Sequence, residues 1–190
     1  LYFPNFLSLK TETFWDLLGQ QKKRCIIINQ PSTYPARKIN GILISGFVAL
    51  DLAKAVFPPS FKPSLEKINY QIDIDTYKCR ENHELLWGEL NNTLSGRLNA
   101  LEALWKEDWD YLQLVITGTD RLQHFVWQAY EDENHTYHQN FIDYYRRIDQ
   151  IIQKVFAMFQ KITDTNEGIY MLSDHGFTGI EQEVYLNPWL

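Results

Sequence analysis

Short apolar runs that alternate with long amphipathic stretches constrain the fold of this chain more than any other feature. Residues 25–28 read Cys-Ile-Ile-Ile, and a continuous β-branched run of this length is typical of a strand buried on both faces, as in a parallel sheet. Strand-like runs follow at 110–117 and 168–173. The stretches 81–106 and 137–162 place apolar residues three or four positions apart and are long enough to connect parallel strands. We therefore predict an α/β fold with a mostly parallel sheet.

The segment before the first predicted strand is expected to be a short helix. Thr13 is followed three residues later by Asp16, which is a capping-box pattern at a helix N-terminus. The apolar residues that follow end near Gly19, so the predicted helix ends there. A helix followed by a strand is half of an α/β unit.

Residues 30–63 interrupt the alternation with closely spaced prolines and glycines. Such punctuation predicts loops and turns, and we expect a short strand at 42–44 and a helical turn within 51–57. A loop-rich stretch of this length is uncommon in a compact domain unless it is functional. We therefore treat residues 30–63 as a substrate-side segment of a single α/β domain that covers 1–190.

The composition argues against several classes of protein. The formal net charge is −6, and no basic run exceeds the three residues Lys22-Lys23-Arg24, so binding of nucleic acid through its phosphates is not expected. The longest apolar stretch, 41–50, is about half the length of a membrane helix. Cys25 and Cys79 form no Cys-x-x-Cys pair, which argues against a disulfide framework or zinc knuckle and favours a reducing, cytoplasmic location.

Two of the predicted strands lead into the same kind of chemistry. The second strand is followed by Asp120 and His124, and the third by Asp174 and His175. Ligands of open α/β sheets bind beyond the carboxyl ends of the strands, so we expect both pairs at one rim. If Asp120 opens a helix, His124 lies on the same helix face. The adjacent pair needs an irregular turn, for which Gly176 provides backbone freedom.

Carboxylate oxygen combined with imidazole nitrogen favours Zn²⁺, Mn²⁺ or a similar ion over Ca²⁺ or Mg²⁺. Two such ions would activate a nucleophile and bind a phosphoryl oxygen. Taken singly, Asp120 as a helix cap and Asp174 as a turn residue would explain either pair without a metal. Their occurrence together at equivalent strand ends favours the metal-binding interpretation.

These motifs resemble those of a known family. Thr-Asp-x-x-x-His at 119–124 and Ser-Asp-His-Gly at 173–176, separated by a long helix, are similar to the alkaline phosphatase superfamily. The type I phosphodiesterase/nucleotide pyrophosphatase-like branch, with its predicted phosphohydrolases and phosphomutases, is the most similar. Further resemblance lies in Pro31-Ser32-Thr33-Tyr34-Pro35, Asn40-Gly41, Ser45-Gly46-Phe47 and 120–127. The resemblance implies a three-layer α/β fold with a central, mostly parallel sheet flanked by helices, incomplete in this chain and part of a larger catalytic domain.

The resemblance also implies two divalent cations, zinc or manganese. One would be bound by Asp120 with His124 and the other by Asp174 with His175. Members of this superfamily further use a metal-binding Asp, a Thr or Ser nucleophile and an additional His. We expect the first two to precede Leu1 and the last to follow the final residue, so no catalytic nucleophile is assigned here. Each site would keep two protein ligands, and we expect the chain alone to bind metal weakly or not at all and to be inactive.

The implied activity is metal-dependent phosphoryl transfer by a phosphohydrolase, phosphodiesterase or phosphomutase. The substrate would be a small phosphate ester or a phosphodiester. Candidate substrate-binding residues are Tyr34, Arg37 and Asn40 in the loop-rich segment and Arg121 in the first motif.

Two other interpretations are weighed against this one. A non-catalytic α/β binding or interaction domain that retains the fold is the alternative. Sulfatase-like chemistry is disfavoured, because neither Cys25 nor Cys79 lies in a Cys-x-Pro-x-Arg sequence. An incomplete sheet would leave an edge and an apolar face exposed, which predicts self-association.

Overall fold

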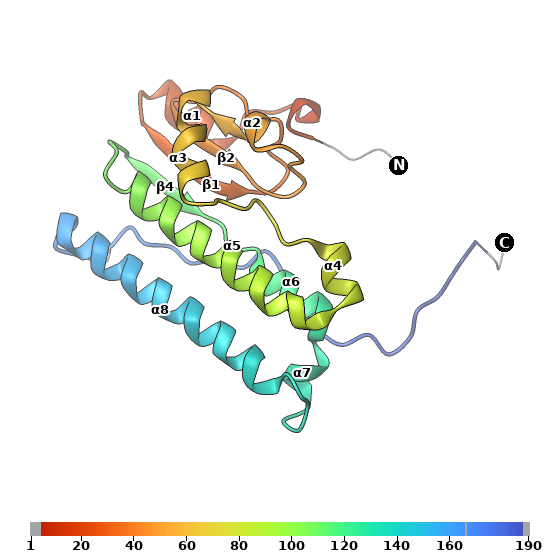
Figure 1. The fold of residues 1–190 in the computed structure, drawn as a ribbon. Coiled ribbons are helices and arrows are strands. Elements are labelled where there is room, and N and C mark those ends of the chain that lie inside the picture. The colour runs from red at the N-terminus through yellow and green to blue at the C-terminus, as the bar shows by residue number, and fades with distance from the viewer. Residues whose placement is uncertain (1–4, 166, 188–190) are drawn as a thin grey trace. The chain divides into compact units, whose positions relative to one another are not determined.

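The chain alternates strands and helices in the computed structural model (Figure 1). The model describes residues 5–165 and 167–187. Two compact units make up the chain, one ending at Arg121 and the other beginning at Leu122. The two ends of the predicted domain, residues 1–4 and 188–190, lie outside the described residues.

The first unit contains a mixed, mostly parallel sheet of order β3-β2-β1-β4. Strand β1 (Cys25–Gln30) pairs in parallel with both β2 (Gly41–Ser45) and β4 (Tyr111–Leu114), and β3 (Val56–Phe57) pairs antiparallel with β2. The carboxyl ends of the three parallel strands therefore lie at one edge of the sheet. This arrangement confirms the predicted fold class.

The apolar run in β1 occupies the centre of the sheet. Ile26, Ile27 and Ile28 are fully buried, and Ile26 lies opposite Ile42 of β2 and Leu112 of β4. Burial on both faces is the environment in which a continuous β-branched run is stable as a strand. Strand β4 is shorter than the predicted 110–117 and only half-buried.

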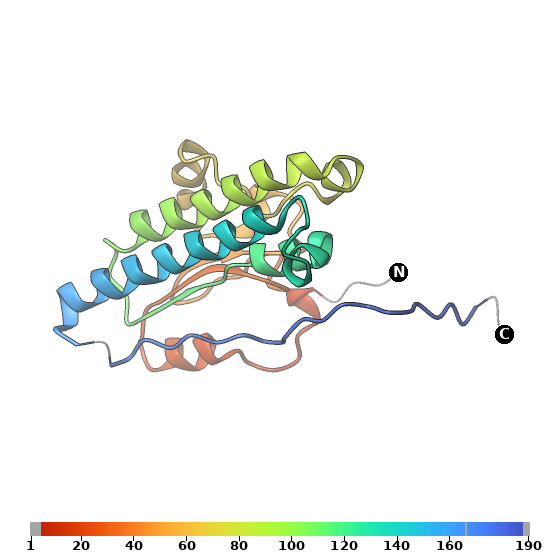
Figure 2. The same cartoon turned by 90° about the horizontal axis from the view of Figure 1, so that it is seen from below.

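Helices cover both faces of this sheet. Cys25 and Ile27 pack in one cluster with Trp15 of α1 (Phe14–Gln20). Helix α5 (His83–Leu104) also contacts β1, and Figure 2 shows it on the face opposite α1. Alternate residues of a strand point to opposite faces, so β1 supplies apolar side chains to both layers.

The capping box predicted at the start of α1 is confirmed. The Thr13 backbone N–H and hydroxyl both donate to Asp16 Oδ2, at 2.8 Å and 2.6 Å. The helix ends at Gln20, one residue beyond the predicted Gly19. The two long helices are also confirmed, as α5 and as α8 (His138–Thr163) of the second unit.

The loop-rich segment contains more regular structure than its prolines suggest. The strand expected at 42–44 is β2, and the helical turn expected within 51–57 is α2 (Leu52–Ala55) followed directly by β3. The remaining short elements are η1 (Phe6–Ser8), η2 (Pro59–Phe61), α3 (Lys62–Lys67), α4 (Thr76–Glu81), α6 (Gly118–Val126) and α7 (Gln128–Glu131).

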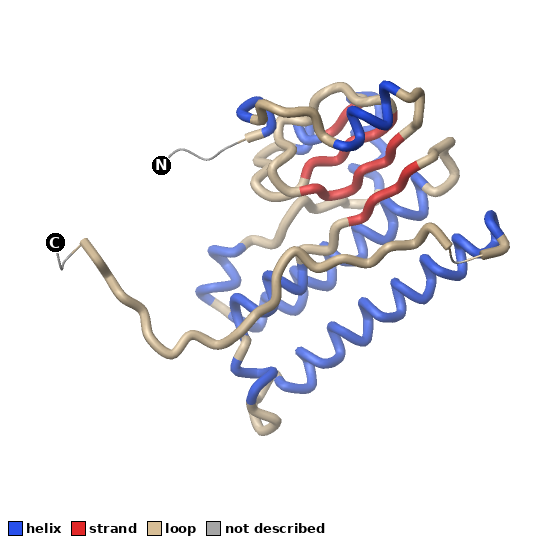
Figure 3. Tube along the Cα trace, turned by 180° about the vertical axis from the view of Figure 1, so that it is seen from behind, coloured by secondary structure: helices blue, strands red, loops and turns tan. Residues whose placement is uncertain are grey.

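The strand predicted at 168–173 is wrong. Residues 167–187 contain neither helix nor strand (Figure 3), and Tyr170, Met171 and Leu172 are more than 70% exposed, at 86%, 75% and 92%. A short apolar run becomes a strand only when it pairs with a neighbour and packs against a core, and this run does neither.

No helix of the described residues is long and apolar enough to cross a membrane.

Candidate metal-binding site

Helix α6 carries the first Asp/His pair. It begins at Gly118, four residues after β4 ends, and the Arg121 N–H donates to Thr117 O at 3.1 Å. Asp120 lies in the first turn, where a carboxylate interacts favourably with the helix dipole. His124 follows one turn later and therefore shares the Asp120 face of the helix. The condition stated for this pair is therefore met, because a helix that begins at Gly118 contains both residues.

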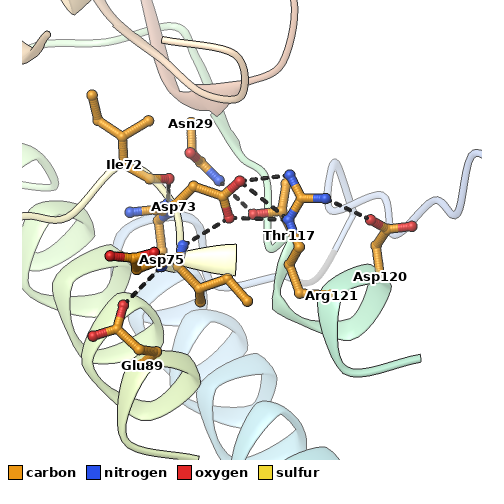
Figure 4. A network of polar contacts seen from close by, with 10 residues as sticks. Asn29, Ile72, Asp73, Asp75, Glu89, Thr117, Asp120 and Arg121 are labelled. Atoms are coloured by element: carbon orange, nitrogen blue, oxygen red, sulfur yellow. Dashed lines mark hydrogen bonds and ion pairs between the residues drawn. The ribbon is translucent and has the colours of Figure 1, made fainter. Parts of the chain in front are cut away.

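The strand ends before α6 are joined by a side chain that the motifs do not contain. Asn29, near the end of β1, donates from Nδ2 to Val115 O at 2.9 Å and to Thr117 Oγ1 at 3.4 Å. Asn29 is fully buried and has a positive φ of 64°, a conformation that asparagine tolerates better than most residues. The pairing of β1 with β2 is irregular at this position. Asn29 thereby connects β1 to the start of α6 (Figure 4).

The second pair lies in the exposed Ser-Asp-His-Gly segment. Because none of the described residues directly before it forms a strand, the expected placement of the two pairs beyond equivalent strand ends is wrong. Ser173 Oγ donates to His175 O at 2.6 Å, and His175 Nδ1 lies 2.8 Å from Gly176 O. A carbonyl oxygen only accepts hydrogen bonds, so this contact assigns the proton to Nδ1 and leaves Nε2 as the metal-binding nitrogen. Nε2 is 3.9 Å from Asp174 Oδ1. Two ligands of one tetrahedral zinc ion lie about 3.3 Å apart, so a small adjustment would let this pair bind one ion.

Within the second unit, an aromatic contact brings this segment to the helix that carries the first pair. The Phe177 ring packs edge-on against His124, with a centroid separation of 5.0 Å, and lies 5.1 Å from the ring of Trp127. At Gly179 an added Cβ would lie 3.1 Å from Glu131 Oε1, so the backbone here closely approaches α7. Phe177 and Gly179 are the partly buried members of the otherwise exposed stretch 171–180.

The donor types of the two pairs fit a first-row divalent cation, because each pair combines a carboxylate with an imidazole. Each pair offers two protein ligands, whereas zinc sites use three or four. No group of three or more acidic, histidine or cysteine side chains with metal-binding geometry occurs in the part of the chain that the structure describes. The residues therefore fit the cation in chemistry, and further ligands are needed to complete either site.

Three of the candidate substrate-binding residues make structural contacts. Arg37 forms an ion pair with Asp16 and lies over the Phe6 ring, 4.2 Å from its centroid. Asn40 donates to Lys23 O at 2.8 Å, which places it at the amino end of the parallel strands, opposite Asn29. Tyr34 O accepts a hydrogen bond from the backbone N–H of residue 6 at 3.0 Å. The structure therefore does not bring Asn40 together with Asp120.

Arg121, the fourth candidate, lies beside the first pair. Its guanidinium binds Asp73, from the loop between α3 and α4, through Nε and Nη2. Nothing in the sequence pattern singles out Asp73, because the loop Gln71-Ile72-Asp73-Ile74-Asp75 matches no motif. The sequence gives a weak indication of a role for Asn29, because this polar residue directly follows a buried apolar run, where a solvated side chain is not expected.

Comparison with known proteins agrees with the motifs. A family model described as Type I phosphodiesterase / nucleotide pyrophosphatase matches residues 4–190. No curated protein and no solved structure matches the chain. The matched family consists of metal-dependent phosphodiesterase hydrolases with the alkaline-phosphatase-like fold, to which the mostly parallel α/β sheet corresponds. The chain therefore belongs to the type I phosphodiesterase/nucleotide pyrophosphatase family of the alkaline phosphatase superfamily.

Proposed function

We propose that this chain takes part in the metal-dependent hydrolysis of a phosphodiester or a related small phosphate ester, and that Asp120, His124, Asp174 and His175 bind the cations. Family membership over residues 4–190 supports the reaction class. The observation that carries the residue assignment is the packing of Phe177 against His124. This contact keeps the Ser-Asp-His-Gly segment close to the helix that presents the first pair.

The chain's own residues would act mainly by orientation. The helical backbone of α6 holds Asp120 and His124 one turn apart, and the hydrogen bond from Nδ1 to Gly176 O directs His175 Nε2 away from the backbone. Bound divalent cations supply charge stabilisation to phosphoryl oxygens and acidify an attacking hydroxyl. In this proposal the Thr or Ser nucleophile belongs to a segment that precedes Leu1. Water as the final acceptor gives a hydrolase, and a second hydroxyl gives a phosphomutase.

A non-catalytic binding domain is the second candidate function. It is favoured by the two-ligand character of each pair, because the described residues do not complete a three-ligand group. Such a domain would bind a phosphate ester without converting it.

The test is hydrolysis of bis(4-nitrophenyl) phosphate in the presence of Mn²⁺ or Zn²⁺ by a protein that includes the segment preceding Leu1. Asp120→Asn and Asp174→Asn should each lower kcat/KM by about a hundredfold or more. Each substitution replaces a charged cation ligand by a neutral side chain of similar volume. Asp149→Asn is the matched control, since Asp149 is an exposed carboxylate on α8 that accepts a hydrogen bond from Gln153.

Wild-type rates in both ligand variants would contradict the proposal. Saturable binding of the phosphodiester without turnover by the wild-type protein would instead support the binding domain.

A further inference from the structure

Arg121, in the first turn of α6, has its guanidinium between two carboxylates, those of Asp73 and Asp120. Nε donates to Asp73 Oδ1 at 3.2 Å and to Oδ2 at 3.1 Å, and Nη2 donates to Oδ2 at 2.5 Å. Nη1 lies 3.7 Å from Asp120 Oδ2. The planar face of the guanidinium covers the Phe47 ring, 4.3 Å from its centroid. Arg121 is therefore hydrogen-bonded to Asp73 through Nε and Nη2 and makes a longer ion pair with Asp120 through Nη1 (Figure 4).

The ion pair of Arg121 with Asp73 is largely shielded from water, so its two charges interact strongly. The side chains of Arg121 and Asp73 are 14% and 17% exposed, whereas Asp120 is 32% exposed. Fork-shaped, charge-assisted hydrogen bonds of this kind are both directional and strong. Removing one member of such an ion pair leaves the charge of the other member uncompensated.

Helix α5 holds Asp73 in position. Arg97 of α5 donates to the backbone carbonyls of Gln71 and Ile72, just before Asp73. On the other side, the Asp75 N–H donates to Glu89 Oε2 of α5 at 3.0 Å. The loop that carries Asp73 is therefore fastened to a long helix on both sides of this residue.

The charge arrangement suggests a role for Asp73. A guanidinium released from Asp73 would pair more closely with the Asp120 carboxylate than the present 3.7 Å and would oppose a divalent cation at the same oxygen atoms. We propose that Asp73 is a positioning residue: by binding Nε and Nη2 of Arg121, it limits the guanidinium to a long ion pair with Asp120 and so lets a divalent cation compete for the Asp120 carboxylate. This inference rests on the proposed function, in which Asp120 is a metal ligand.

The test is calorimetric titration of the chain with Mn²⁺ at low ionic strength, carried to cation concentrations that saturate the weak two-ligand sites. Asp73→Asn should weaken Mn²⁺ binding by about 10- to 100-fold, the range found when a residue that supports a metal ligand is replaced. The double variant Asp73→Asn/Arg121→Met should regain most of that affinity, because no guanidinium is then left to occupy Asp120. Asp75→Asn is the matched control: it makes the same charge change in the same loop, but Asp75 pairs with Lys78.

A merely structural role for the pair predicts the opposite for the double variant. If Asp73 and Arg121 only fasten α6, the double variant should bind Mn²⁺ as weakly as Asp73→Asn, and that result would overturn the inference. Unchanged affinity in Asp73→Asn would overturn it as well. A readout without metal is the NMR signal of the Arg121 Nε–H, which should shift and exchange faster in Asp73→Asn but not in Asp75→Asn.

Failure of the proposed function is distinguishable. An Asp120→Asn variant that binds Mn²⁺ as tightly as the wild type would contradict the metal-ligand assignment itself. Loss of binding in Asp120→Asn, combined with wild-type affinity in Asp73→Asn, would contradict only the role of Asp73.

Discussion

Phe177 is the side chain on which the proximity of the Ser-Asp-His-Gly segment to α6 depends. We predict that Phe177→Leu shifts the NMR signals of the His124 ring protons, because the edge-on aromatic ring at 5.0 Å is lost. Cation affinity should fall about tenfold, as expected when a group that orients a ligand is removed. Phe177→Tyr, which keeps the ring, should restore both properties.

The control for Phe177 is Ile180→Ala, since Ile180 is 78% exposed in the same segment. It should leave the His124 signals and the cation affinity unchanged. Identical His124 signals in Phe177→Leu and the wild type would show that the two rings are not in contact in solution.

Asn29 fastens the end of β1 to the residues that lead into α6. Asn29→Ala removes two side-chain hydrogen bonds and places alanine at a φ of 64°. Asn69→Ala is the matched control, because Asn69 is exposed and has a φ of 51°. In urea unfolding, Asn29→Ala should lose about 1–3 kcal/mol more of the unfolding free energy than Asn69→Ala. Equal losses would mean that the buried hydrogen bonds add nothing.

The metal-ligand candidates could be predicted from the sequence, whereas the residues that support them could not. Asp120 and His124 stand out because their spacing matches one helical turn. Asp73 contributes through a contact with Arg121 that spans 48 residues, and no local pattern carries such information. Phe177 adjoins a recognisable motif, but its partners His124 and Trp127 are identified only by the folded structure.

At the scale of elements, an ion pair joins the amino ends of β1 and β4. Asp110 accepts hydrogen bonds from Lys23 Nζ and from the Arg24 N–H, both at 2.8 Å. The Lys23 side chain and the Arg24 amide hold the pKa of Asp110 below its usual value. A carboxyl whose pKa falls on folding stabilises the folded state above its unfolded pKa, and this contribution disappears as the pH falls through the folded pKa.

We therefore predict that the wild-type chain loses more stability below about pH 4 than Asp110→Asn does. Urea unfolding across the acid range measures this difference. Lys23→Met should reduce the same pH dependence, because it removes the main cause of the lowered pKa. Parallel pH profiles for the wild type and Asp110→Asn would contradict the prediction.

Helices of this chain were predictable where the determining interactions are local. The capping box of α1 and the apolar stripe of α5 involve residues three or four apart, and both helices begin and end close to the expected positions. Strands depend on partners that are distant in sequence. The run in β1 has neighbours on both sides, whereas the run at 168–173 has none and remains exposed. Sequence alone describes the two runs similarly, so only the fold separates them.

At the scale of the whole molecule, the family match spans both compact units. The first unit contributes the sheet and the start of α6, and the second contains His124 and the Ser-Asp-His-Gly segment. We propose that the two Asp/His pairs of this chain are separate cation ligands, one pair for each of two ions.

The most direct test is the cation stoichiometry, measured by equilibrium dialysis against Mn²⁺ or Zn²⁺ followed by elemental analysis. We predict two bound cations for the wild-type chain at cation concentrations high enough to saturate its weak two-ligand sites, one for Asp120→Asn, one for Asp174→Asn and none for the double variant. Asp149→Asn should bind as the wild type does. A double variant that retains the wild-type stoichiometry would contradict the assignment of these residues as cation ligands.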